Sequence, residues 1–86
     1  MGQREKFLQK ILCGLSDNDL DFNELCRLLD FLGFSSRVKG SHHIFYRHDI
    51  EEIINIQSNG GKAKAYQVKQ IRNILIEYKL GDELDV

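Results

Sequence analysis

The sequence contains no proline and no tryptophan, and only two cysteines among its 86 residues. Those cysteines, Cys13 and Cys26, are too few and too far apart for a zinc finger or a CxxC redox site. We expect both to be buried as small hydrophobic residues in a reducing compartment. Repeats and low-complexity stretches are missing as well, and 42% hydrophobic with 29% charged residues indicates one small globular domain.

Long hydrophobic runs are also missing. No stretch approaches the roughly 20 apolar residues that a membrane-spanning helix needs. Residues 1–9 have neither the basic n-region nor the apolar h-region of a signal peptide. Lys6 stands where the myristoylation pattern requires Ser or Thr. We therefore expect a cytoplasmic protein with no membrane partner.

Charge of one sign does not dominate the chain, whose formal net charge is −1, but its distribution is uneven. Residues 36–80 carry eight basic and four acidic side chains. Residues 1–35 carry four basic and six acidic ones, and residues 81–86 add three acidic ones. A polyanion responds to the local field, so the central segment is where we would expect one to bind.

Three segments have the apolar spacing of amphipathic helices. The first covers residues 3–14. The second begins after Asp21, a predicted N-cap with Glu24 as its capping-box partner, and Gly33 ends it. The third covers about residues 65–79.

The residues between the second and third helices have the pattern of strands. Residues 34–39, 43–47 and 53–57 are predicted strands, joined by short connections at Gly40-Ser41 and at 48–51. Short connections favour an antiparallel meander. The expected fold class is α+β, with the second and third helices covering one face of a three-stranded sheet. The pattern does not indicate where the first helix packs.

The densest polar cluster is Gly-Ser-His-His at residues 40–43. Imidazole can take and give a proton near neutral pH. Adjacent residues of a strand point to opposite faces, so His42 should share a face with Ile44, and His43 with Phe45. On spacing alone, two solvent-exposed histidines at a hairpin are the simpler interpretation.

Two other chemistries are poorly supported at this cluster. Metal binding by His42, His43 and His48 is disfavoured, because neighbours on a strand diverge and no carboxylate pattern accompanies them. Ser41 and His42 are adjacent in sequence and lack an acidic residue to orient them, which disfavours nucleophilic catalysis. We expect no metal and no small-molecule cofactor.

The second cluster begins in a loop, residues 58–64, that we expect to be flexible. Its glycines permit close backbone approach, and Lys62 and Lys64 precede the start of the third helix, where an anion is favoured. Lys69 and Arg72 follow on that helix. Together these side chains can hold a phosphate backbone. An ordinary solvated helix start is the competing interpretation.

Four segments of the chain resemble the HicA family of toxins from toxin–antitoxin systems. They are LCRLLDFLGF at 25–34, GSHHIF at 40–45, EEIINIQ at 51–57 and GGKAKAYQVKQIRNIL at 60–75. The resemblance implies the α-β-β-β-α fold of a double-stranded-RNA-binding domain, here with an extra N-terminal helix. It also implies a metal-independent mRNA endonuclease that a cognate HicB-type antitoxin neutralises.

The resemblance assigns the catalytic histidine to the position just after the glycine-serine turn. That position is His42 or His43, and His42 is slightly favoured because it completes Gly-Ser-His. The residues expected to contact RNA are Lys39, Gly40, Ser41, Lys62, Lys64, Lys69 and Arg72. The implied organisation is an N-terminal helical extension (1–20), a HicA-like domain (21–80) and an acidic tail (81–86).

Two other classes of function remain open at this point. One is a non-catalytic RNA-binding module that uses the same lysines, with the histidines as simple contacts. The other is a protein-interaction domain whose working surface is the helix at 3–14.

Overall fold

The computed structural model describes residues 3–80, and the predicted acidic tail lies outside the described residues. The element order is that of the predicted α+β fold, with the extra N-terminal helix preceding α-β-β-β-α. The elements are α1 (Gln3–Cys13), α2 (Phe22–Phe31), β1 (Ser35–Lys39), β2 (His42–Arg47), β3 (Ile50–Gln57) and α3 (Ala65–Glu77).

The ends of α2 are set by local chemistry. Asp21 is the N-cap, and its carboxylate accepts a hydrogen bond from the backbone N–H of Glu24 at 2.9 Å. At the other end, Gly33 adopts a φ of 91°, the left-handed conformation that ends many helices. The Arg47 guanidinium also donates to the exposed end of the helix at the Leu32 carbonyl, at 2.7 Å. Both predicted boundary residues are confirmed.

The sheet is an antiparallel meander with the strand order β1-β2-β3, as predicted. Lys39 pairs with His42, so Gly40 and Ser41 form a two-residue turn. Gly40 has a φ of 63°, which suits the first central position of a type II′ hairpin. The predicted start of the third strand at residue 53 is wrong, because β3 already begins at Ile50, which is buried and pairs with Arg47.

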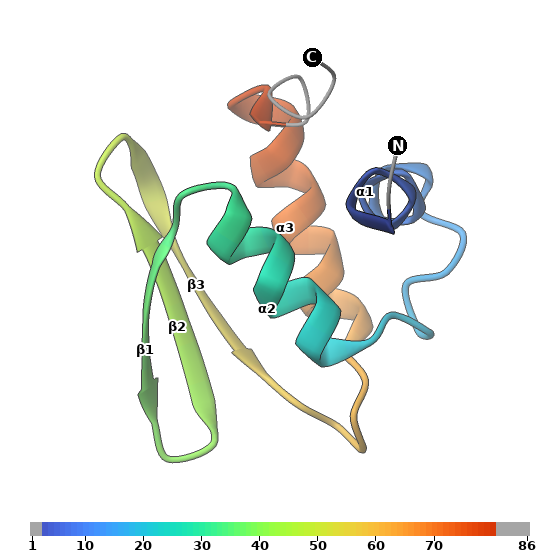
Figure 1. Ribbon diagram of the computed structural model, residues 1–86, viewed down its shortest axis with the longest axis horizontal. Coiled ribbons are helices and arrows are strands. Elements are labelled where there is room, and N and C mark those ends of the chain that lie inside the picture. The colour runs from blue at the N-terminus through green and yellow to red at the C-terminus, as the bar shows by residue number, and fades with distance from the viewer. Residues whose placement is uncertain (1–2, 81–86) are drawn as a thin grey trace.

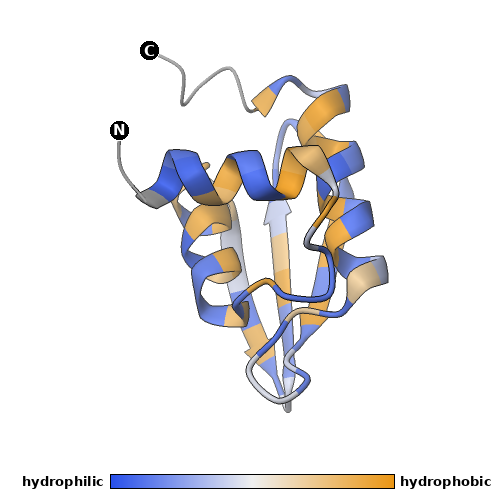
Figure 2. Cartoon of the chain, turned by 90° about the vertical axis from the view of Figure 1, so that its right-hand side faces the viewer, coloured by the Kyte–Doolittle hydropathy of each residue, from blue (hydrophilic) through white to orange (hydrophobic). Residues whose placement is uncertain are grey.

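The molecule has three layers, with α2 and α3 between the sheet and α1 (Figure 1). The core lies on the helix-covered face of the sheet, where Ile54 and Ile56 of β3 are fully buried. Hydrophobic and hydrophilic residues alternate around the helices, and α1 crosses over the other two (Figure 2). The packing of α1, which the sequence did not indicate, uses its buried side chains Phe7, Leu8 and Ile11.

The connection between β3 and α3 is held against the start of α2. Phe22 N–H donates to the Gly61 carbonyl, and Ala63 N–H donates to the Leu20 carbonyl, both at 2.9 Å. Gly61 N–H donates to the Ser58 hydroxyl within the loop. The sequence predicts a flexible loop here, whereas its backbone groups are paired with a segment distant in sequence.

The two cysteines differ from their common prediction. Cys13, the last residue of α1, is exposed, so its predicted burial is wrong. Helical periodicity places it on the opposite side of α1 from the buried Phe7, Leu8 and Ile11. Cys26 is partly buried and packs against the core. Burial raises the pKa of the Cys26 thiol to about 11, and Asp21 adds to the shift.

Among residues 3–80, none of the helices has the length and apolar character that a membrane-spanning helix needs.

The difference in burial between Cys13 and Cys26 predicts that their thiols react at different rates. At pH 8 the thiolate of Cys26 is scarce, since its pKa lies about three units higher, and the thiolate is the reacting species. Iodoacetamide should therefore alkylate Cys13 at least about tenfold faster than Cys26. Peptide mapping by mass spectrometry would measure both rates. Faster modification of Cys26 in the folded protein would contradict the burial described here.

Candidate nucleic-acid interface

The two candidate histidines lie on opposite faces of β2, as predicted from the strand period. His42 is exposed on the open face of the sheet. His43 is partly buried on the face that the helices cover, next to the buried Phe45. A substrate group at one imidazole therefore meets different neighbours from a substrate group at the other.

His42 is oriented by the adjacent strand. Its Nδ1 lies 3.0 Å from Oδ1 of Asn55. An amide oxygen only accepts hydrogen bonds, so the contact is a hydrogen bond in the tautomer with the proton on Nδ1, and in that tautomer Nε2 is the acceptor of the neutral ring. Lys39 lies directly across the hairpin on the same face. The Ser41 hydroxyl accepts a hydrogen bond from Gln57 at 2.8 Å.

His43 is held by an aromatic contact. The ring packs against Phe22, the first residue of α2, with centroids 5.0 Å apart and an interplanar angle of 76°. This edge-to-face geometry is favourable for aromatic rings. The backbone N–H of Phe22 also donates a hydrogen bond to the Gly61 carbonyl in the loop between β3 and α3. His43 is therefore joined through one residue to the loop that carries Lys62 and Lys64.

The starts of α2 and α3 and the turn between β1 and β2 lie at the same end of the molecule. The turn between β1 and β2, the start of α2 and the loop before α3 are all at the lower end in Figure 1 and Figure 2. Lys64 precedes α3 at the N-cap position, and a lysine side chain offers no acceptor to the first amides of the helix. Gln67 Oε1 accepts from the backbone N–H of Lys64 at 3.4 Å.

The basic side chains of the second cluster are in different environments. Lys62 forms an exposed ion pair with Asp19, with Nζ and Oδ1 separated by 2.8 Å. The hydrogen bond and the charge of Asp19 raise the pKa of Lys62, and Lys62 in turn lowers the pKa of Asp19. Lys69 is exposed on α3, and Lys64 is partly buried.

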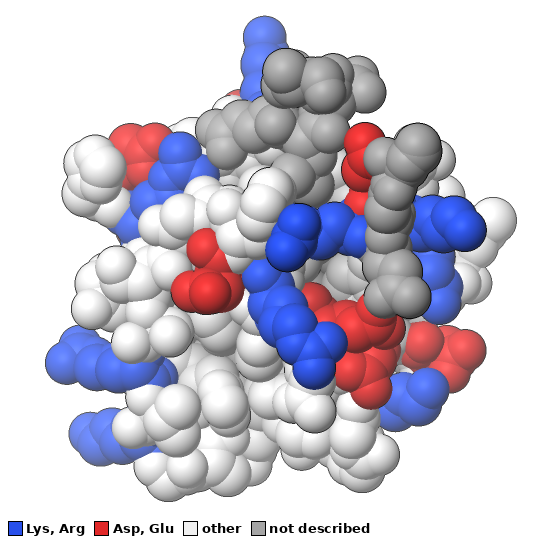
Figure 3. Space-filling model, viewed as in Figure 1, with Lys and Arg blue, Asp and Glu red and all other residues white. Residues whose placement is uncertain are grey.

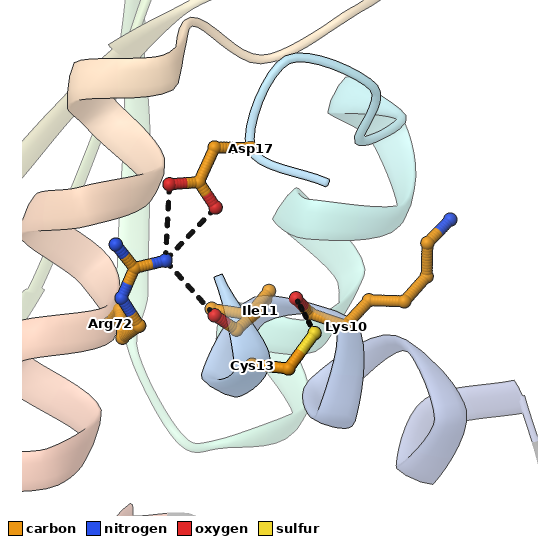
Figure 4. A network of polar contacts seen from close by, with 5 residues as sticks. All are labelled: Lys10, Ile11, Cys13, Asp17 and Arg72. Carbon is orange, nitrogen blue, oxygen red and sulfur yellow. Dashed lines mark hydrogen bonds and ion pairs between the residues drawn. The ribbon is translucent and has the colours of Figure 1, made fainter. Parts of the chain in front are cut away.

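Arg72 holds α1 in place (Figure 4). Its Nη1 donates to the Ile11 carbonyl at 3.1 Å and to both carboxylate oxygens of Asp17, the nearer at 2.9 Å. The side chains of Arg72 and Asp17 are only 17% and 12% exposed. Gly14, with a φ of 75°, lets the guanidinium approach, because a Cβ there would lie 3.3 Å from Nη1. These contacts give Arg72 a structural role.

The three histidines do not gather into one site. His48 follows the last residue of β2, so it lies at the opposite end of that strand from His42 and His43. Within the part of the chain that the structure describes, no group of three or more His, Cys, Asp or Glu side chains is arranged to hold a metal ion.

Several residues that shape this interface were not singled out from the sequence. Phe22 supports His43, and Asp19 and Asp17 neutralise two of the basic side chains; each contact joins segments far apart in the chain. Tyr66 had a local signal, since it stands between Lys64 and Lys69, and its side chain is 67% exposed. Exposed aromatic rings among lysines are typical of surfaces on which bases stack.

The charges on this side of the molecule are mixed. Lysine and arginine alternate with aspartate and glutamate over the helices, instead of forming one basic patch (Figure 3). The basic side chains at the lower left, beside β1, have no acidic neighbour in this view. On the helix-covered side, individual basic side chains therefore lie next to acidic ones, and no broad positive field forms there.

Comparison with known families shows the general class of this protein, which is a toxin component of a bacterial toxin–antitoxin system. A family model described as HicA toxin of bacterial toxin-antitoxin matches residues 22–78, well over half of the chain. The chain belongs to this HicA toxin family. The match covers α2 through α3 and excludes α1 and residues 14–21. Neither the curated proteins nor the solved structures contained a significant match.

The structural role of Arg72 can be tested against a nearby cation. Arg72→Met should lower the free energy of unfolding by about 1–3 kcal/mol, because the nearly buried Asp17 carboxylate loses its partner. Lys69→Met, on the same helix but exposed, should change it by no more than about 0.5 kcal/mol. Urea denaturation would measure both, and equal effects would contradict the assignment.

Proposed function

We propose that the protein is a metal-independent endoribonuclease that cleaves mRNA, with His43 as its proton acceptor. Membership of the HicA toxin family supports this reaction. The observation that carries the assignment of His43 is its contact with Phe22, which links the imidazole to the loop of Lys62 and Lys64. A base and phosphate-binding cations are what RNA cleavage requires.

The reaction uses the 2′-hydroxyl of the RNA as the nucleophile. His43 takes the 2′-hydroxyl proton as the oxygen attacks the adjacent phosphorus. The bond from phosphorus to the 5′-oxygen breaks, and that oxygen takes a proton from water. Lys62 and Lys64 balance the extra negative charge on the phosphate while it is five-coordinate. Lys69 binds a neighbouring phosphate.

His42 is the alternative proton acceptor. Its contact with Asn55 orients the ring, and in the tautomer with the proton on Nδ1 the other nitrogen, Nε2, can accept a proton. It shares the open face of the sheet with Lys39, whereas the loop lysines and the start of α3 lie with the helices. Although the Gly-Ser-His pattern slightly favours His42, the position of the loop favours His43. Gly40 and Ser41 form the turn that directly precedes both histidines.

Substitution of each histidine separates these assignments. His43→Gln should lower the rate of RNA cleavage by about 10²- to 10⁴-fold, the usual contribution of a positioned base. His42→Gln, the matched variant one residue away, should leave most activity. The measurement is cleavage of a labelled RNA in excess EDTA, which should not slow the wild-type protein.

The opposite ranking of the two variants would assign the base to His42. Undiminished cleavage by a double variant would remove catalysis by either histidine and leave a non-catalytic RNA-binding module. Loss of activity in EDTA that Mg²⁺ restores would contradict the metal-independent mechanism.

We also propose that a HicB-type antitoxin inhibits the protein by covering the same surface. The family match implies such a partner. Covering His43 and the loop at 58–64 would exclude RNA by direct competition. An antitoxin that binds there should present carboxylates to Lys62 and Lys64, which would make association fast and sensitive to salt.

Charge reversal at the loop should therefore weaken both interactions. Lys64→Glu should lower the affinity for RNA and for the antitoxin together, and Lys79→Glu, beyond the end of α3, should affect neither. Titration of a labelled RNA complex with the antitoxin should release the RNA. A ternary complex that retains RNA would contradict inhibition by competition.

A further inference from the structure

The segment that joins α1 to α2, residues 14–21, carries acidic side chains onto the basic residues of the interface. Asp19 pairs with Lys62, 43 positions away, and Asp17 pairs with Arg72, 55 positions away. Both aspartates precede the region that matches the HicA family, and both cations lie within it. The N-terminal segment thus adds negative charge to a domain expected to bind a polyanion.

The two ion pairs differ in their exposure to solvent. The side chains of Asp17 and Arg72 are 12% and 17% exposed, whereas those of Asp19 and Lys62 are 74% and 50% exposed. Breaking a nearly buried pair is costly, but an exposed pair contributes little and exchanges readily. The inner pair therefore anchors the segment, and the outer pair can open without releasing it.

The backbone keeps the Asp19 carboxylate beside the Lys62 ammonium. Asp19 N–H donates to the Ser16 carbonyl in a turn, and the next residue, Leu20, is fully buried and accepts from Ala63 N–H. Asp19 directly precedes Leu20, and Lys62 directly precedes Ala63. The backbone hydrogen bond between Leu20 and Ala63 therefore holds the two charged residues side by side. A tethered group of this kind acts at a high effective concentration.

We propose that Asp19 is a built-in competitor for RNA phosphate at Lys62, so that the N-terminal segment lowers the affinity of this toxin for RNA. The inference rests on the proposed function, because it assigns Lys62 to the RNA surface. When RNA binds, a phosphate oxygen replaces the Asp19 carboxylate on Lys62, while the pair between Asp17 and Arg72 stays closed.

This exchange has a signature in the dependence on salt. The ions released on binding are cations condensed on the RNA, and a carboxylate that stays beside Lys62 reduces the positive charge that displaces them. The paired lysine therefore contributes less to the salt-dependent part of binding. Removal of the Asp19 charge should tighten binding and steepen the decrease of log K with log salt. The change in slope should be at most about 0.7, the value for one phosphate of a single strand.

The test uses the full chain and a single-stranded RNA with 2′-O-methyl groups, which cannot be cleaved because the nucleophile is blocked. At about 0.1 M salt, where the Debye length is about 10 Å, Asp19→Asn should bind this RNA about two- to fivefold more tightly than the wild-type protein, in line with the small energies of exposed pairs. The matched control is Asp30→Asn, which removes one exposed negative charge near the other end of α2. It should change the affinity by less than about 1.5-fold, because charges beyond a Debye length are screened.

A double-mutant cycle identifies the partner of Asp19. In a Lys62→Ala background, Asp19→Asn should no longer tighten binding. A gain that persists in this background would overturn the proposal, because the effect would then be one of general charge. Equal affinities for the Asp19→Asn and Asp30→Asn proteins would also overturn it, while wild-type binding to RNA would leave the proposed function standing. If no variant bound RNA in a salt-dependent way, the proposed function itself would fail.

Discussion

Two backbone hydrogen bonds hold the interface together: Phe22 N–H to the Gly61 carbonyl, and Ala63 N–H to the Leu20 carbonyl. Leu20, Phe22 and Ala63 are all buried, so their backbone groups must find partners within the protein. By pairing with each other, these segments bring the starts of α2 and α3 to one end of the molecule. The ring of Phe22 then reaches His43, and Lys62 reaches Asp19.

The fold was largely predictable because its signals are local. The cap at Asp21, the left-handed Gly33 and the turn at Gly40 each act within a few residues, and alternation along β2 separates the two histidines by face. The predicted start of β3 is wrong, because Ile50 directly follows a turn and its burial depends on the core that it contacts. The packing of α1 depends on Arg72, whose partners lie more than fifty residues away.

The interface was less predictable than the fold. The sequence identifies histidines and lysines as residue types suited to RNA cleavage, but each depends on a neighbour from a distant segment. Arg72 has the same charge as Lys69, and only the position of Asp17 gives it a structural role. The choice between His42 and His43 similarly depends on Phe22, whose apolar spacing in α2 indicates a core residue and nothing more.

The near-neutral charge of the chain is compatible with a polyanion substrate because charges differ in how firmly they are paired. A nearly buried pair such as Asp17 with Arg72 is costly to break, so counting its two charges in a net charge misrepresents the surface. The exposed pair of Asp19 with Lys62 costs little free energy to break, so Lys62 can exchange the carboxylate for another anion. Lys64 places a positive charge at the start of α3, and the exposed Lys69 places another one within that helix. Under the proposed function, RNA therefore encounters the cations that can change partners, and the proposed role of Asp19 makes residues 14–21 determine one of these cations, Lys62.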